Sequence, residues 1–219
     1  SLQGVCRTWA KVLGTTVCWP AMLGSQSRKT RVKDFVEFVK HQRFRACKTV
    51  DFGCRSAKGL FASAFSAMPL VIAVRLPAGC GSVNMSREFC ERVPAAQLRQ
   101  LALGSSWIED NARNHHREVR KQYAGLWPRL ASLQVLSASW WSYYSQAHGG
   151  VALAELLRSI VAHMPNLVRL KFTSSDFDSS YKAELDPVRP EMLVAIAKST
   201  TALTHLALDG FFSFSAATL

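Results

Sequence analysis

The sequence lacks the short motifs that mark common catalytic and nucleotide-binding sites. None of G-x-S-x-G, G-x-x-x-x-G-K-[ST], H-E-x-x-H or G-x-G-x-x-G occurs in it. The glycine-rich stretch at residues 79–82 has no lysine of the kind that phosphate-binding loops use. We therefore expect a protein that is not an enzyme and that needs no cofactor.

Paired cysteines are also missing. The six cysteines stand at positions 6, 18, 47, 54, 80 and 90, and none are spaced as C-x-x-C or clustered with histidine as in a zinc finger. The adjacent His115 and His116 would point in different directions on a helix, so we expect no metal site. Cys47 lies at an apolar position of a repeated pattern, which predicts a buried free thiol. Unpaired cysteines favour an intracellular location for the protein, in the cytoplasm or nucleus, with the mitochondrion as the alternative.

Long apolar runs are absent as well. The apolar stretch at 150–164 contains Glu155, Arg158 and His163 and is too short to cross a bilayer. The first residues lack the basic start and apolar run of a signal peptide. We therefore expect no membrane span.

Acidic residues are few, with 15 Asp and Glu against 27 Lys and Arg, and the net charge is +12. The excess is uneven: residues 1–60 contribute +9 and residues 61–219 contribute +3. The densest run is Arg28, Lys29, Arg31 and Lys33. A basic segment of this kind binds acidic protein, RNA or anionic lipid, and a solvated helix face is the alternative.

What the sequence does contain is a repeated pattern of three apolar residues, in which two residues separate the first from the second and one separates the second from the third. It occurs six times, with successive starts 24, 27, 32, 37 and 36 residues apart. A repeat of this period predicts one supersecondary unit stacked on copies of itself. The copies are Cys47-Val50-Phe52, Val71-Val74-Leu76, Leu98-Leu101-Leu103, Leu130-Leu133-Val135, Leu167-Leu170-Phe172 and Leu203-Leu206-Leu208.

Strands and helices alternate along these copies. In each copy the second and third apolar residues alternate as on a β-strand and would point into the core, so the residues between them would point outward. Helical spacing separates the copies, most clearly at 151–161, also at 32–44 and after Pro190, and more weakly at 86–98 and 117–127. This order predicts an α/β solenoid with parallel strands on the concave face and helices on the convex face.

The L-x-x-L-x-L units resemble leucine-rich repeats of the longer, helix-containing kind found in ribonuclease-inhibitor-like and F-box-associated proteins, over roughly residues 32–210. The resemblance implies a scaffold that binds protein. The family places Asn or Cys three residues after the last apolar residue of each copy, and this chain does not, which predicts irregular loops. The residues found there are Arg55, Gly79, Ser106, Ala138, Ser175 and Phe211.

Residues 1–22 carry a second resemblance. The string Val5-Cys6-Arg7-x-Trp9, followed by Trp19, is similar to the second half of an F-box, whose opening is not in this sequence. The resemblance implies that Val5, Cys6, Trp9 and Trp19 contact an acidic Skp1-type linker protein. It divides the chain into a partial F-box-like helical cap with a basic linker at 1–31 and a leucine-rich-repeat domain of about six repeats at 32–219, truncated at its C-terminus. A cap that only shields the first repeat is the alternative.

Two groups of residues are candidates for partner binding. The outward residues of the predicted concave face are mixed in sign, and its cations favour an acidic or phosphorylated peptide or protein. The face lacks the basic stripe and stacking aromatics of a nucleic-acid groove. These residues are Asp51, Arg75, Gln100, Gln134, Arg169, Lys171, His205 and Asp209. The second group is a candidate interface hot spot, unless its loop folds back on the core; it comprises Trp140, Trp141, Tyr143 and Tyr144.

The two resemblances together imply a non-enzymatic substrate-recognition adaptor of an SCF-type ubiquitin ligase, whose repeats hold the target. The alternative is a structural leucine-rich-repeat subunit of a large assembly, such as a mitochondrial ribosome or a respiratory complex. In that case the F-box-like segment serves only as a cap on the first repeat.

Overall fold

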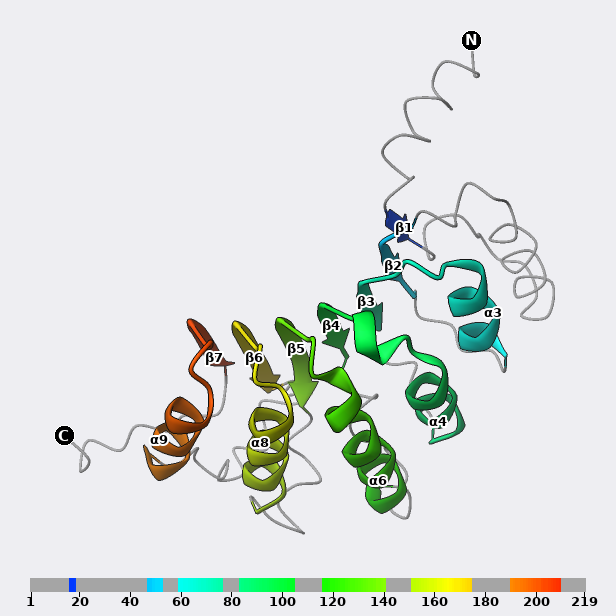
Figure 1. Cartoon of the computed structure of the whole chain (residues 1–219). Helices are drawn as coiled ribbons and strands as arrows, with labels where there is room; N and C mark the ends of the chain where they lie inside the picture. The colour runs from blue at the N-terminus through cyan, green and yellow to red at the C-terminus, as the bar shows by residue number, and fades with distance from the viewer. Residues whose placement is uncertain are drawn as a thin grey trace.

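The fold is a mixed α/β arrangement built on a single parallel sheet. The computed structural model describes residues 16–18, 47–52, 59–76, 83–104, 116–140, 151–174 and 190–209. Seven strands lie side by side in chain order, and every neighbouring pair is parallel. The strands form one row and the helices form a second row along one side of it (Figure 1).

The elements alternate as the repeated pattern predicts. The strands are β1 (Thr16–Cys18), β2 (Thr49–Asp51), β3 (Ala73–Leu76), β4 (Gln100–Leu103), β5 (Val135–Trp140), β6 (Arg169–Ser174) and β7 (His205–Asp209). The α-helices are α3 (Leu60–Ala67), α4 (Val83–Arg92), α6 (His116–Leu126), α8 (Val151–His163) and α9 (Pro190–Ser199). Short 3-10 helices, η2 (Ala95–Gln97) and η3 (Trp127–Leu130), precede β4 and β5. The helices predicted around 151–161 and after Pro190 are confirmed as α8 and α9.

The strand register aligns the apolar residues of successive repeats into rows that cross the sheet. One row runs through Val50, Val74, Leu101, Leu136, Leu170 and Leu206, and a second lies two residues further along each strand. All members of the first row except Leu206 are buried. Because each side chain packs on its neighbours in the row, the core is one continuous layer between sheet and helices.

The predicted frame is wrong for the fourth copy. We expected Leu133 and Val135 to point inward, but the register pairs Leu101 with Leu136 and Leu103 with Ala138. Leu133 instead takes the first position of the copy, equivalent to Leu98 and Leu167. In all three residues the backbone N–H donates a hydrogen bond to the carbonyl three residues earlier, which for Leu133 is that of Leu130. Both Leu130-Leu133-Val135 and Leu133-Leu136-Ala138 fit the spacing of the pattern. The second is correct, but its last residue is the small Ala138 where most copies have a large apolar residue.

The sheet also has one strand more than the six predicted. β1 lies inside the range 1–31 that we assigned to a helical cap, and it pairs in parallel with β2 through Thr16–Thr49, Val17–Val50 and Cys18–Asp51. Gly14 stands in the sequence where other copies have their first apolar residue. For this reason the pattern alone did not reveal the strand.

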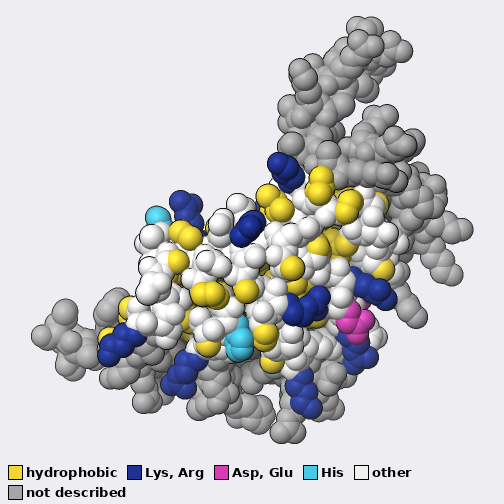
Figure 2. All heavy atoms as spheres, in the orientation of Figure 1, with side chains coloured by type: hydrophobic (Ala, Val, Ile, Leu, Met, Phe, Trp, Pro, Cys, Tyr) yellow, Lys and Arg dark blue, Asp and Glu magenta, His cyan; other side chains and the backbone are white. Residues whose placement is uncertain are grey.

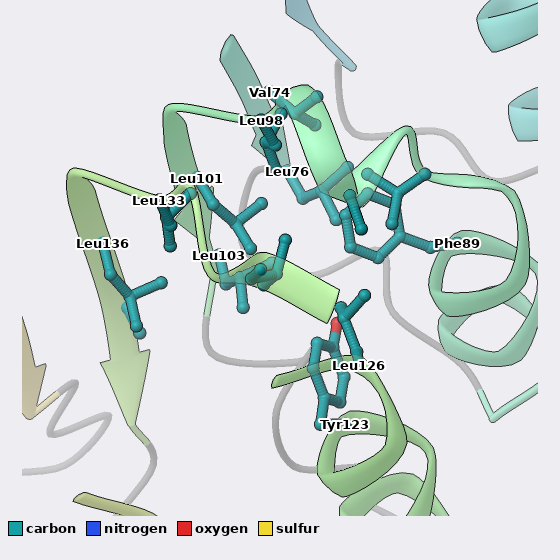
Figure 3. Close-up of a cluster of buried hydrophobic side chains, with 14 of the residues drawn as sticks. Val74, Leu76, Phe89, Leu98, Leu101, Leu103, Tyr123, Leu126, Leu133 and Leu136 are labelled. Carbon is teal, nitrogen blue, oxygen red and sulfur yellow. The ribbon is translucent and has the colours of Figure 1, made fainter. Parts of the chain in front are cut away.

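The core is densest where the helices meet the sheet. Under β2, the Phe52 and Phe61 rings meet edge to face with centroids 4.9 Å apart, and Phe61 meets Phe89 in the same way at 5.4 Å. Further along, the inward side chains of β3, β4 and β5 point toward the side that bears Phe89, Tyr123 and Leu126 (Figure 3). Edge-to-face pairs of this kind add to the stabilisation from buried area.

Polar side chains link successive repeats along the edge where the strands begin. Gln97 Nε2 donates to the Pro69 and Val71 carbonyls at 2.6 and 3.0 Å, and Asn166 Nδ2 donates to the Ala131 carbonyl at 2.9 Å. Each bond joins one turn to the turn of the preceding repeat. These bonds satisfy carbonyls that would otherwise depend on water, and they tie the spacing of the turns to the spacing of the strands.

A carboxylate from the next repeat caps helix α3. Glu88 on α4 accepts hydrogen bonds from the backbone N–H groups of Gly59, Phe61 and Ala62 at 2.9, 3.1 and 3.2 Å. The first N–H groups of a helix have no partner within the helix and carry its positive dipole end, so an anion there is stabilising. Gly59 adopts a left-handed φ of 83° at this junction.

We expect Glu88→Ala to lower the free energy of unfolding by about 2 kcal/mol, because three N–H groups lose a charged acceptor. Glu88→Gln should cost less, since one oxygen is retained. Urea denaturation followed by circular dichroism measures the effect. Glu91→Ala, at an exposed position of the same helix, is the control. A Glu88→Ala variant as stable as this control would contradict the capping role.

Candidate functional site: the open face of the sheet

The candidate site is the sheet face opposite the helices, which we call the open face. Its residues alternate with the inward apolar rows. In the described strands β2 to β7 they are Thr49, Asp51, Ala73, Arg75, Gln100, Ala102, Val135, Ser137, Ser139, Arg169, Lys171, Thr173, His205 and Ala207. Arg75, Gln100, Arg169, Lys171 and His205 are exposed. The open face therefore presents polar side chains to solvent.

The register places the open-face residues in cross-strand rows. One row runs from Arg75 through Ala102 and Ser137 to Lys171. Neighbouring strands lie about 4.8 Å apart, so the Cα atoms of Arg75 and Lys171 are about 14 Å apart. Only the small side chains of Ala102 and Ser137 stand between these two cations in the row.

Basic residues outnumber acidic residues on this face. Arg75 Nη1 lies 3.6 Å from Asp51 Oδ2, and because Arg75 is largely exposed, this ion pair contributes little to stability. On β6, Arg169 and Lys171 are two residues apart and share the face. Lys and Arg side chains are also spread over the side of the molecule seen in Figure 2, which includes the helices, so the basic character extends beyond the open face. This charge distribution favours an acidic partner.

The structure brings most of the predicted concave-face residues onto the strands. Arg75, Gln100, Arg169, Lys171 and His205 lie on the open face, and Asp51 lies there half-buried. The backbone of Asp209 lies in β7, opposite Thr173.

Gln134 is the exception. It precedes β5 in the turn, and its N–H donates to the Arg99 carbonyl at 2.8 Å. The frame error described above caused this misplacement, and Val135 and Ser137 occupy the open face of β5 instead. If the fourth copy is aligned as Leu133-Leu136-Ala138, alternation along the strand places Val135 and Ser137 on the open face.

The other predicted sites fall outside the described residues. This applies to Val5, Cys6, Trp9 and Trp19 of the F-box-like segment, and to Trp141, Tyr143 and Tyr144 of the aromatic group. Trp140 closes β5, where its backbone pairs with Ser174.

The buried ionisable groups in the core are held in their protonated forms. Burial raises the pKa of the Cys47 thiol, and it raises the pKa of the Cys90 thiol to about 12. Burial likewise raises the pKa of the Tyr123 hydroxyl well above its usual value. Cys47 is a buried thiol that forms no disulfide, as predicted. Since thiolates are the reactive form of cysteine, neither thiol is poised as a nucleophile.

Within the described ranges, no three His, Cys, Asp or Glu side chains gather in a way that would hold a metal ion. A search of the same ranges finds no helix with the length and apolar character that crossing a membrane requires. No protein-family model and no curated protein matches the sequence.

We expect Cys47 and Cys90 to resist alkylation by iodoacetamide at pH 8 in the folded protein, because both thiols are buried and protonated at that pH. Both should react within minutes in concentrated urea at the same pH. Peptide mass spectrometry, which resolves the two sites, measures the labelling. Rapid labelling of Cys90 in the folded protein would contradict its placement.

Proposed function

We propose that this chain is a non-enzymatic protein–protein interaction module of the leucine-rich-repeat solenoid type, and that its open face binds the partner. The observation that carries this proposal is that none of the described elements covers the open face, whose exposed charged and polar side chains are held in register. The alternation of helix and strand, with strands paired in chain order, supports the solenoid assignment.

The partner that fits this surface is an acidic or phosphorylated polypeptide segment. Arg75 and Lys171 stand in one cross-strand row and suit anionic groups of a partner, and Arg169 adds a planar guanidinium suited to carboxylate or phosphate. Ala102 and Ser137 between them allow a backbone to approach the sheet closely.

The resemblance of residues 1–22 to half an F-box supports a specific role for this module, as the substrate-recognition adaptor of an SCF-type ubiquitin ligase. In that role Val5, Cys6, Trp9 and Trp19 contact the Skp1-type linker protein and the open face holds the target. The basic charge of residues 1–60 complements an acidic linker protein.

The adaptor role predicts that the tagged chain, isolated from its native cells, is accompanied by a Skp1-type protein and a cullin. Trp9→Ala should abolish recovery of both, because an aromatic anchor of the interface is removed. Quantitative mass spectrometry of the captured material measures this. Stoichiometric ribosomal or respiratory subunits in place of the linker protein and the cullin would contradict the adaptor and support the alternative, a structural subunit of a large assembly.

Binding through the open face predicts that Arg169→Glu reduces target recovery about tenfold in the same capture, because a cation facing the partner becomes an anion. Arg158→Glu is the matched control, since this substitution makes the same charge change at an exposed position of helix α8. Binding should also weaken with rising salt concentration. Equal losses from both variants would show that net charge, and not the open face, determines binding.

A further inference from the structure

Two basic side chains stand next to each other on the open face, where β6 lies beside β7 (Figure 1). The register pairs Arg169 with His205, and both side chains are exposed. Neighbouring strands lie about 4.8 Å apart, so the two side chains leave the sheet side by side. Among the described side chains, no carboxylate lies within ion-pair distance of Arg169, whereas Arg75 has Asp51 as its partner.

The hydrogen bonds of Thr204 orient the His205 ring. Thr204 Oγ1 lies 2.7 Å from His205 Nδ1 and 3.3 Å from the Val168 carbonyl oxygen. That carbonyl oxygen already accepts the N–H groups of Thr204 and His205, at 2.9 and 3.1 Å. Because a carbonyl oxygen has two lone pairs, the single hydroxyl proton goes to Nδ1 over the shorter distance. We therefore assign the neutral ring as the tautomer that carries its proton on Nε2.

The Arg169–His205 pair consequently offers hydrogen-bond donors and no acceptor. The Nε2–H group donates from the neutral ring, and it still donates when His205 is protonated, because Thr204 Oγ1 then accepts from Nδ1. The Arg169 guanidinium has N–H donors only and binds an oxyanion through two parallel hydrogen bonds. This fork with a further donor beside it suits a group with three terminal oxygens. A phosphoryl group has three such oxygens, whereas a carboxylate has two.

We propose that the Arg169–His205 pair is a phosphate-binding subsite of the open face, and that it takes the phosphoryl group of a phosphorylated serine or threonine in the partner. The subsite rests on the proposed function, in which an acidic or phosphorylated segment binds this face, and it narrows that partner to a phosphorylated one. The phosphoryl oxygens accept from the guanidinium fork and from Nε2–H. At neutral pH the phosphoryl group also brings more negative charge than a carboxylate does.

A titration of the full chain with blocked O-phosphoserine, N-acetylated and N-methylamidated, at pH 7.5 tests the subsite. Proton NMR follows the C2–H resonance of the His205 ring, which is identified by its absence from His205→Gln. We expect a saturable shift of this resonance. Blocked glutamate at equal ionic strength should bind about tenfold more weakly, because it brings less charge and one oxygen fewer. His163 is the internal control, since it is an exposed histidine on α8 and its resonance should not move.

Arg169→Gln should weaken the binding of blocked phosphoserine about tenfold, because the guanidinium fork is lost. Arg169→Lys keeps the charge without the fork and should recover only part of the affinity. Arg158→Gln is the matched control, because it removes the same charge from an exposed position of α8, and it should leave the affinity unchanged. Circular dichroism spectra that match the parent chain show that each variant is folded.

A His205 resonance that does not respond to blocked phosphoserine would overturn the subsite. A response of equal size to blocked glutamate would overturn it as well, because the pair would then not distinguish a phosphoryl group from a carboxylate. Equal losses of affinity from Arg169→Gln and Arg158→Gln would also overturn it, since net charge and not the pair would then determine binding.

Phosphatase treatment of the lysate separates a failure of the subsite from a failure of binding through the open face. In the capture from native cells, the treatment should lower target recovery as much as Arg169→Glu does. If the treatment has no effect while Arg169→Glu still lowers recovery relative to Arg158→Glu, the subsite is overturned and binding through the open face stands.

Discussion

The structure depends on the alignment of apolar residues into rows across a parallel sheet. Each inward side chain packs beside its equivalents on the neighbouring strands, as Leu136 lies between Leu101 and Leu170. The connecting helices lie along one side of the sheet, so the other side stays polar. The strands accordingly alternate apolar and polar residues, as in Arg169-Leu170-Lys171-Phe172, unlike parallel strands covered on both faces.

Much of this arrangement was predictable because the chain repeats it. The strand–helix alternation, the helices α8 and α9, and five of the six strand frames follow from apolar spacing alone. Around Leu133 the spacing permits two frames, and backbone pairing between Gln134 and Arg99 fixes the correct one. Apolar spacing contains no information about such pairing. Gly14, which stands where other copies have their first apolar residue, likewise concealed β1.

The residues of the open face could be predicted wherever the strand frame was predicted correctly. Arg75, Gln100, Arg169, Lys171 and His205 follow from alternation, whereas Val135 and Ser137 were lost with the shifted frame. The Glu88 cap on α3 and the Gln97 bonds across turns join residues 26–29 positions apart. No local pattern indicates these partners, because they are set by how one repeat stacks on the next.

The order of the strands has a consequence for how the chain acquires its structure. Every strand pairs only with its neighbours in sequence, at separations of 24 residues between Val50 and Val74 and 36 between Leu170 and Leu206. The loops to be closed are therefore short, and their entropic cost grows only slowly with length. Such a chain can fold progressively as it emerges from the ribosome, because each new repeat finds its template already formed behind it.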